Sequence, residues 1–127
     1  MGKVLQNDKK IINTKFGNSA YDGKSFSIDS LHQSINHSLS RLGIEKVDTL
    51  FLHNPRNEIE DYDRVFSLFE KLKQENKIHY AGISLARNHI YGKELEYFDV
   101  VQSDYNLLYQ NDISAFKINN KKCFQAR

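Results

Sequence analysis

The chain has few of the residues that build covalent or metal-based scaffolds. Its 127 residues include a single cysteine, Cys123, which excludes an internal disulfide and any metal cluster held by several cysteines. The five histidines are scattered and the acidic residues show no metal-ligand spacing, so no metal site is expected. Because a disulfide framework is ruled out, we expect a reducing, cytoplasmic setting.

Long apolar runs and an excess of one charge are also missing. No stretch approaches the roughly 18 apolar residues of a transmembrane helix, and residues 1–10 lack the apolar centre of a signal peptide. Eighteen basic and sixteen acidic residues are interspersed and give a formal net charge of +2. We therefore expect neither a nucleic-acid nor a membrane partner. The length suits one domain over residues 1–127.

The most informative stretch runs from Lys46 to Pro55. Residues 47–52 are mostly apolar and β-favouring, and the run is too short for an independent helix, which indicates a strand buried on both faces. The only proline, Pro55, cannot donate to a strand ladder, so pairing is expected to end near His53. His53 then stands at the carboxyl end of a buried strand, where α/β folds carry their chemistry. On this segment alone, a histidine that closes the end of the core fits equally well.

Strand and helix patterns alternate along the rest of the chain. Strands are predicted over 11–16, 47–52, 77–84 and 98–103, with a further short strand at 123–126. Helices are predicted from about 28 to 42, from about 65 to 76, within 87–97 and from 112 to about 119. Ser27 or Asp29 is expected to cap the first helix, and Gly43 to end it in a left-handed conformation. This alternation predicts repeated βαβ units and a parallel sheet with outer helices.

Four polar side chains fall at the carboxyl ends of four predicted strands. They are Lys15, His53, Ser84 and Gln102. Right-handed βαβ connections place all four ends on one rim of the sheet. A lysine and a histidine there can polarise a carbonyl, and a serine and a glutamine can hydrogen-bond an amide. Four such residues on one rim favour a functional site, and we expect them to line one cleft, with Lys15 and His53 nearest each other.

Several segments resemble the aldo-keto reductases. The similar segments, in the order and spacing of that family, are Ile12–Gly17, Ser38–Pro55, Leu68–Lys77 leading into Tyr80–Ser84, and Val100–Leu108. Members of the family are (β/α)₈ barrels that reduce aldehydes and ketones with NADPH. The resemblance implies that this chain forms an incomplete barrel domain, about strands three to six or seven of the family barrel.

The resemblance also implies a role for each of the four rim residues. Lys15 is similar to the lysine that lowers the pKa of a catalytic tyrosine, and His53 to the histidine that orients the substrate carbonyl. Ser84 and Gln102 are similar to the residues that hold the nicotinamide carboxamide. The family often has an asparagine after that serine, where this chain has Leu85.

Other parts of the family pattern have no counterpart in this sequence. The strands that supply the catalytic tyrosine and its aspartate partner have no equivalent before Lys9, and the loops that hold the cofactor phosphates have none in residues 1–127. A protein with the sequence as it stands is therefore expected to be inactive alone. Two alternatives stay open: an active reductase completed by a second chain, or a non-enzymatic interaction module. Two unpaired sheet edges are also expected to favour self-association.

Overall fold

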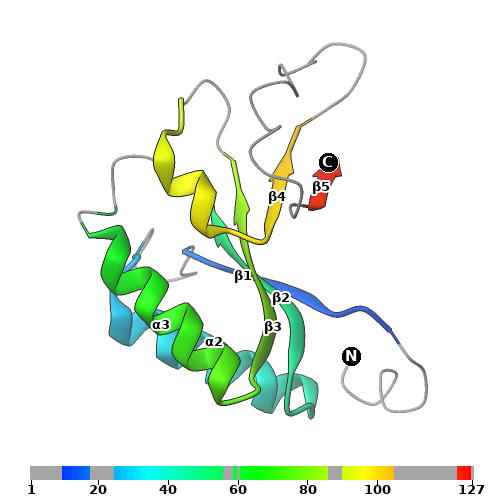
Figure 1. Cartoon of the computed structure of the whole chain (residues 1–127). Helices are drawn as coiled ribbons and strands as arrows, with labels where there is room; N and C mark the ends of the chain where they lie inside the picture. The colour runs from blue at the N-terminus through cyan, green and yellow to red at the C-terminus, as the bar shows by residue number, and fades with distance from the viewer. Residues whose placement is uncertain are drawn as a thin grey trace.

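The fold is a parallel sheet with helices packed on one face (Figure 1). The computed structural model describes residues 10–17, 25–55, 59, 61–85 and 90–104, and the backbone of 123–126. In this part of the chain, five strands lie in the order β1-β2-β3-β4-β5. They are β1 (Asn13–Phe16), β2 (Val47–His53), β3 (Ile78–Ser84), β4 (Val100–Ser103) and β5 (Cys123–Ala126). Each neighbouring pair is parallel. The prediction that β2 lies between the strands ending at Lys15 and Ser84 is confirmed.

Helix α2 (Ile28–Leu42) begins and ends where its sequence signals lie. The Ser27 side chain accepts a hydrogen bond from the backbone N–H of Ser30 at 3.2 Å, which satisfies one of the free donors of the first turn. Gly43 ends the helix with φ 67° and ψ 35°, a left-handed conformation that glycine adopts without steric cost. Its N–H donates to the carbonyls of the last turn. Of the two predicted caps, Ser27 is the one used.

Helix α3 (Tyr62–Gln74) connects β2 to β3. Asp61 caps it by accepting from the N–H of Arg64 at 3.2 Å. The helix begins three residues before the predicted start and ends two residues before the predicted end. Asn76 follows with φ 56°, a conformation that asparagine tolerates better than most residues do. The tight connection lets the N–H of Lys77 donate to the carbonyl of Leu72 at 2.9 Å, just before β3 begins.

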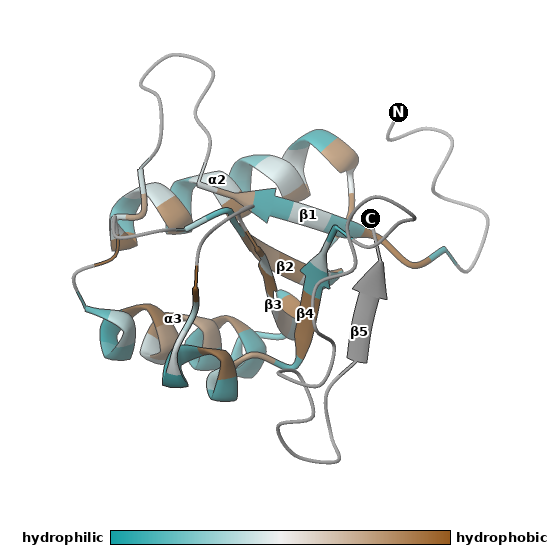
Figure 2. Cartoon of the chain, turned by 90° about the horizontal axis from the view of Figure 1, so that it is seen from above, coloured by the Kyte–Doolittle hydropathy of each residue, from teal (hydrophilic) through white to brown (hydrophobic). Residues whose placement is uncertain are grey.

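The main hydrophobic core lies between the helices and one face of the sheet (Figure 2). Side chains along a strand point alternately to opposite faces. The residues that point toward the helices belong to this core, namely Phe16, Leu50, Leu52, Ala81, Ile83 and Val101, and they pack with the apolar sides of α2 and α3. The alternate residues of the same strands point to the opposite face, which we call the site face. It carries Lys15, Phe51, His53, Ser84 and Gln102.

The segment between β3 and β4 differs from the prediction. Within 90–104, the predicted helix is reduced to one 3₁₀ turn, η1 (Lys93–Tyr97), consistent with the weak apolar pattern there. Strand β4 begins two residues later than predicted, because Asp99 turns the chain into the sheet. Its N–H donates to the carbonyl of Ala81 and its carboxylate accepts from the N–H of Ala81, both at 2.9 Å. The helix predicted at 112–119 lies outside the described residues.

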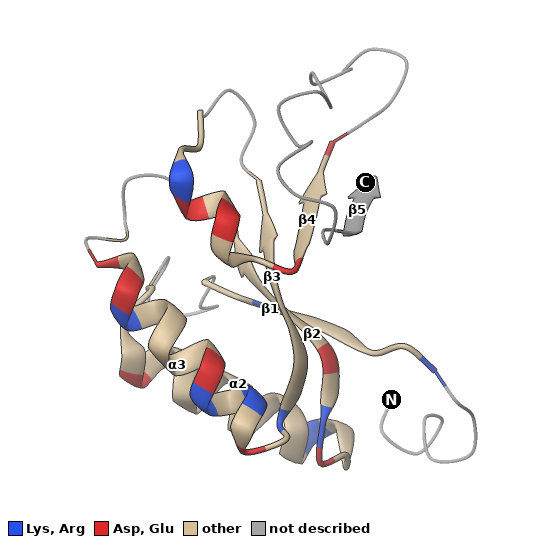
Figure 3. Cartoon of the chain, in the orientation of Figure 1, with Lys and Arg blue, Asp and Glu red and all other residues tan. Residues whose placement is uncertain are grey.

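Charged side chains lie mainly on the helices and at the strand ends, with both signs interspersed (Figure 3). The middle of the sheet carries few of them. Among the described helices, none has the length and apolar character needed to cross a membrane.

Candidate active site

The site face presents its polar residues in one row across the sheet. His53, the last residue of β2, pairs with Ser84 at the end of β3, and Ser84 pairs with Gln102 on β4. Lys15 on β1 pairs with Phe51, two residues before His53. Because residues two apart on a strand share a face, Lys15 belongs to the same face as this row. The strand-end positions inferred from the sequence therefore correspond to one rim in the structure.

The Lys15 side chain reaches across two strands. Its amine donates to the Ser84 hydroxyl at 3.4 Å and to the Gln102 side-chain oxygen. The Ser84 hydroxyl also donates to that oxygen, at 3.2 Å. Lys15, Ser84 and Gln102 thus form one hydrogen-bonded group, which we call the polar triad. The expectation that Lys15 lies nearest His53 stays a prediction, since the amine contacts that define the triad are with Ser84 and Gln102.

Burial strengthens the contacts of the polar triad. Ser84 is 0% exposed and Gln102 is 8% exposed, while Lys15 as a whole residue is exposed. Buried polar groups need partners, because leaving one unpaired costs about 1–3 kcal/mol. Here the Ser84 hydroxyl is paired with the Gln102 side-chain oxygen, and the Lys15 amine adds a positive charge beside this pair. The arrangement offers hydroxyl, amide and ammonium groups to a polar ligand on this rim.

Phe51 and Gly82 form the floor beneath the triad. They pair across β2 and β3, and the Phe51 ring covers the Cα of Gly82 so closely that a Cβ built there would lie 2.5 Å from ring atom Cδ1. Phe51 is 1% exposed although it points away from the main core. Gly82 thus allows the close approach of the ring. The role of Phe51 was missed; its spacing of two from His53 was the available signal.

Asn54 fixes the point where the chain leaves β2. Its backbone takes up φ 51° and its N–H donates to the carbonyl of Ser84 at 2.8 Å. The Asn54 side-chain amide points its nitrogen toward β3, the orientation in which its donors face acceptors. This nitrogen donates to the Ser84 carbonyl at 3.2 Å and to the Leu85 carbonyl at 3.1 Å. The Tyr91 hydroxyl donates to the carbonyl of Pro55. These contacts tie the end of β2, and so His53, to the end of β3.

Leu85 follows Ser84 where the family resemblance leads one to expect asparagine. The leucine is buried in the main hydrophobic core. Its N–H donates to the carbonyl of Gln102 at 2.8 Å and extends the β3–β4 pairing. An apolar side chain adds no hydrogen bond to a carboxamide, so any such contact on β3 comes from Ser84 alone.

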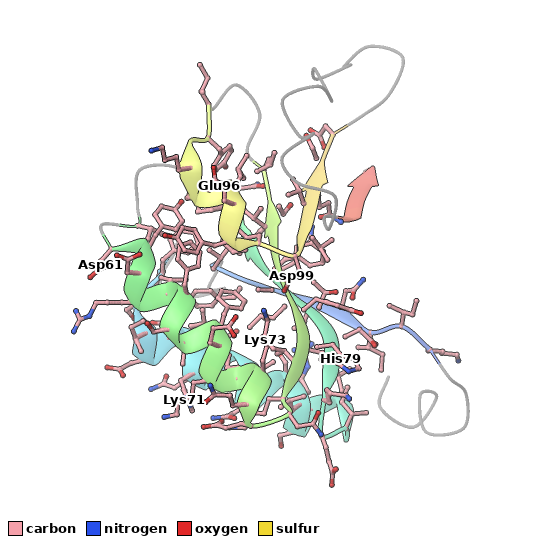
Figure 4. All side chains as sticks on the ribbon, viewed as in Figure 1. Asp61, Lys71, Lys73, His79, Glu96 and Asp99 are labelled. Carbon is pink, nitrogen blue, oxygen red and sulfur yellow. The ribbon has the colours of Figure 1, made fainter. Side chains whose placement is uncertain are left out.

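A second charged group joins α3 to the sheet near the start of β4. The Lys73 amine lies 2.9 Å from the Asp99 carboxylate and 2.9 Å from that of Glu70, and Figure 4 shows Lys73 and Asp99 facing each other between α3 and β3. Burial lowers the pKa of Lys73, but hydrogen bonds to Glu70 and Asp99 and their charges outweigh it, so the pKa lies above its ordinary value. This group holds α3 against the sheet and is remote from the triad in the strand register.

No group of three or more histidine, cysteine, aspartate or glutamate side chains suited to a metal ion occurs among the described residues. A hollow of about 1100 Å³ lies between the beginnings of α2 and α3, on the helical side of the sheet. It is separate from the triad, and its walls are formed by residues such as Phe26, Ile59, Val65 and Leu68.

A parallel sheet with outer helices and polar strand ends defines an α/β protein. The model of the aldo/keto reductase family matches residues 1–125, and the chain therefore belongs to that family. A comparison with curated protein sequences gave no match.

Solved structures give the same assignment. The holo form of an aldo-keto reductase from Bacillus halodurans is 28% identical over 82% of this chain, with a TM-score of 0.70, and the match covers 38% of that protein. Its apo form is 26% identical with a TM-score of 0.60 over 82% of this chain and 34% of that protein. A glycerol dehydrogenase from Gluconobacter oxydans shares the fold, with a TM-score of 0.77 at 21% identity over 98% of this chain and 42% of that one. The chain thus spans less than half the length of each of these proteins and corresponds to part of their barrel.

Proposed function

We propose that this chain contributes part of the active site of an NADPH-dependent reductase that converts aldehydes and ketones to alcohols in the cytoplasm. Membership of the aldo/keto reductase family supports the reaction class. The observation that carries the proposal is the polar triad, in which Lys15, Ser84 and Gln102 meet at the carboxyl ends of parallel strands. A cytoplasmic setting agrees with the single cysteine of the sequence.

The residues at the rim fit the nicotinamide end of the cofactor. A carboxamide has one carbonyl acceptor and one amino donor, and both must be paired when it is held in a protein. The Gln102 amide and the Ser84 hydroxyl each offer a donor and an acceptor. The two residues lie on neighbouring strands, and their side-chain oxygens are 3.2 Å apart. NADPH, when bound, supplies the hydride. Ser84 and Gln102 would fix the orientation of its carboxamide.

Lys15 and His53 are proposed to act on the substrate carbonyl. His53 at the exit of β2 donates a hydrogen bond to the carbonyl oxygen and so draws electron density from the carbon. The Lys15 ammonium stabilises negative charge on that oxygen or on the phenol oxygen of a neighbouring catalytic tyrosine. Both groups project from strand ends tied together through Asn54 and the triad, so their separation is set by the sheet rather than by a loop.

Titration with NADPH followed by carbonyl-dependent oxidation of the cofactor tests this function. We expect saturable binding that Ser84→Ala and Gln102→Ala weaken about fivefold each, since each removes a hydrogen bond to a buried amide worth ~1 kcal/mol. His53→Ala should leave binding unchanged. Because the chain is expected to be inactive alone, oxidation is measured in an assembly that completes the barrel, where His53→Ala should slow it about 10²-fold or more, the usual size of a lost proton or hydrogen-bond donor. Ser40→Ala and Gln74→Ala, at exposed helix positions, are the matched controls. A wild-type protein that fails to bind NADPH overturns the proposal.

Completion by a second chain remains a separate prediction. In the described part of the chain, β1 and β5 are the outermost strands of the sheet, and outer strands carry unpaired backbone groups that can pair with another chain. Light scattering during gel filtration distinguishes a monomer from a dimer. A dimer that alone oxidises NADPH favours completion by a second copy, whereas binding of an unrelated protein without NADPH binding favours an interaction module.

A further inference from the structure

The Phe51 ring lies between β1 and β3 on the site face. Lys15 pairs with Phe51, and Phe51 pairs with Gly82. The Lys15 amine is 6.0 Å from the centroid of the Phe51 ring and lies over its face. The same amine bonds Ser84 and Gln102 beyond the ring. The side chain of Lys15 therefore crosses β2 above Phe51 to reach β3 and β4.

Gly82 sets the position of the ring. A Cβ at residue 82 would approach Phe51 atoms Cδ1 and Cε1 to 2.5 and 2.7 Å, and the Thr49 methyl to 2.9 Å. Because glycine has no Cβ, the ring can settle against the backbone of β3 and leave room above itself. Phe51 is 1% exposed yet stands outside the main core cluster. Its burial thus comes from the site face, and not from the helices.

The chemistry of this contact favours a charged Lys15 amine. The face of an aromatic ring carries negative electrostatic potential, and an ammonium within about 6 Å of the centroid is attracted to it. An aliphatic residue of similar size would offer the same hydrocarbon surface without that potential. The lysine has a long, flexible stem with about 2 kcal/mol of rotamer entropy. A fixed surface beneath the stem therefore favours the conformers that place the ammonium over the ring.

We infer that Phe51, seated on Gly82, is a positioning residue that holds the Lys15 ammonium over the strand ends, where it acts on a carbonyl substrate. The action of Lys15 on a carbonyl substrate rests on the proposed function. The position that Phe51 gives to the Lys15 ammonium is a property of this chain alone. Phe51 acts through Lys15 and need not touch the substrate.

Proton NMR of the Lys15 side chain tests the positioning without any cofactor. The Cε–Hε signals of Lys15, identified by their loss in Lys15→Arg, should carry a ring-current shift relative to the exposed Lys10. Phe51→Leu and Phe51→Met, two aliphatic replacements of different shape, should move these signals toward those of Lys10. Phe51→Tyr, which keeps the ring, should leave them in place. Phe69→Leu, which shortens an equally buried phenylalanine in the main core, should have no effect on them.

Carbonyl-dependent NADPH oxidation provides the second reading. In an assembly that oxidises NADPH, Phe51→Leu should lower kcat about 2- to 5-fold, the equivalent of the ~0.5–1 kcal/mol typical of such a contact. The KM for NADPH should change little, and Phe51→Tyr should keep the wild-type kcat. Lys15 signals that do not move in both aliphatic variants overturn the inference, whatever the activity. Signals that move in a protein that does not bind NADPH support the positioning and count against the proposed function instead.

Discussion

The Lys15 amine on β1 donates to the side-chain oxygen of Gln102 on β4, with two strands between them. The Ser84 hydroxyl donates to the same oxygen. The cation therefore occupies the two side chains that are proposed to hold the nicotinamide carboxamide. The Gln102 oxygen has two lone pairs, and Lys15 and Ser84 already donate to it, while a carboxamide amino group needs the same acceptor. We therefore expect Lys15 to turn from Gln102 toward the substrate when the carboxamide binds.

Replacing Lys15 by methionine is therefore expected to tighten NADPH binding and slow the reaction. Methionine keeps an unbranched apolar stem but cannot donate to Gln102 or Ser84. A hydrogen bond of this kind has a net worth of ~1 kcal/mol, so the Kd for NADPH should fall about fivefold. In an assembly that oxidises NADPH, oxidation should fall to near background. Fluorescence titration of the wild type and of Lys15→Met measures the first effect. Weaker binding in Lys15→Met would show that the lysine holds the cofactor in the ground state.

Gly82→Ala should destabilise the protein through the Phe51 ring. The new Cβ meets the ring at 2.5 Å and the Thr49 methyl at 2.9 Å, so both side chains must move within a packed sheet. Overpacking of this kind costs about 1–3 kcal/mol. Urea denaturation followed by circular dichroism measures the loss, and the double variant Gly82→Ala with Phe51→Leu should recover part of it. Equal losses in the single and double variants would place the strain elsewhere.

Ser27→Ala should remove the cap of α2 together with the exposed hydrogen bond from the Ser27 hydroxyl to the Ser30 hydroxyl at 2.7 Å. The serine oxygen accepts from the N–H of Ser30 at 3.2 Å, and loss of such a cap costs about 1 kcal/mol. Ser40→Ala at an exposed position of the same helix is the control and should change the free energy of unfolding by less than about 0.5 kcal/mol. If both variants lose the same stability, the cap is not the cause.

The Lys73 group predicts a pH dependence of stability. Its folded-state pKa is raised above the ordinary 10.5 by hydrogen bonds to Glu70 and Asp99 that outweigh burial. A group whose pKa is raised on folding contributes stability that is fully present below the unfolded pKa and is lost as pH rises through the folded pKa. The difference in free energy of unfolding between wild type and Lys73→Met should thus be constant from about pH 7 to about pH 9 and shrink above about pH 10.5. A difference that grows with pH would contradict the ion-pair assignment.

The strands of the sheet and their order could be predicted from the sequence, because the patterns that specify them are local. Period-2 and period-3.6 patterns, the cap at Ser27 and the left-handed Gly43 each specify a conformation within a few residues, and short βαβ connections then order the strands. The ends of β1, β2 and β3 at Phe16, His53 and Ser84 lie at or within one residue of the predicted positions. The rim residues followed from those ends.

Contacts between distant strands were not available from the sequence. Nothing local indicates that Lys15 reaches past its neighbour to Gln102, because that depends on the length of its stem and on the low floor formed by Phe51 and Gly82. The start of β4 was also misplaced, since Asp99 bonds Ala81 across the sheet and no periodic pattern records such a bond. The family resemblance implied a role for each rim residue, but it did not indicate which rim residues form hydrogen bonds with one another.

Titration of the Gln102 side-chain amide by NMR is the most direct test that this rim binds the nicotinamide end of NADPH. The Gln102 signals, assigned through Gln102→Ala, should shift in a saturable way with NADPH and with nicotinamide mononucleotide. ADP-ribose, which lacks the nicotinamide, should leave the Gln102 signals unchanged. None of the three ligands should shift the side-chain amide signals of the exposed Gln74. Gln102 signals that stay still with NADPH, or that move equally with ADP-ribose, would contradict the assignment of this rim as the nicotinamide site.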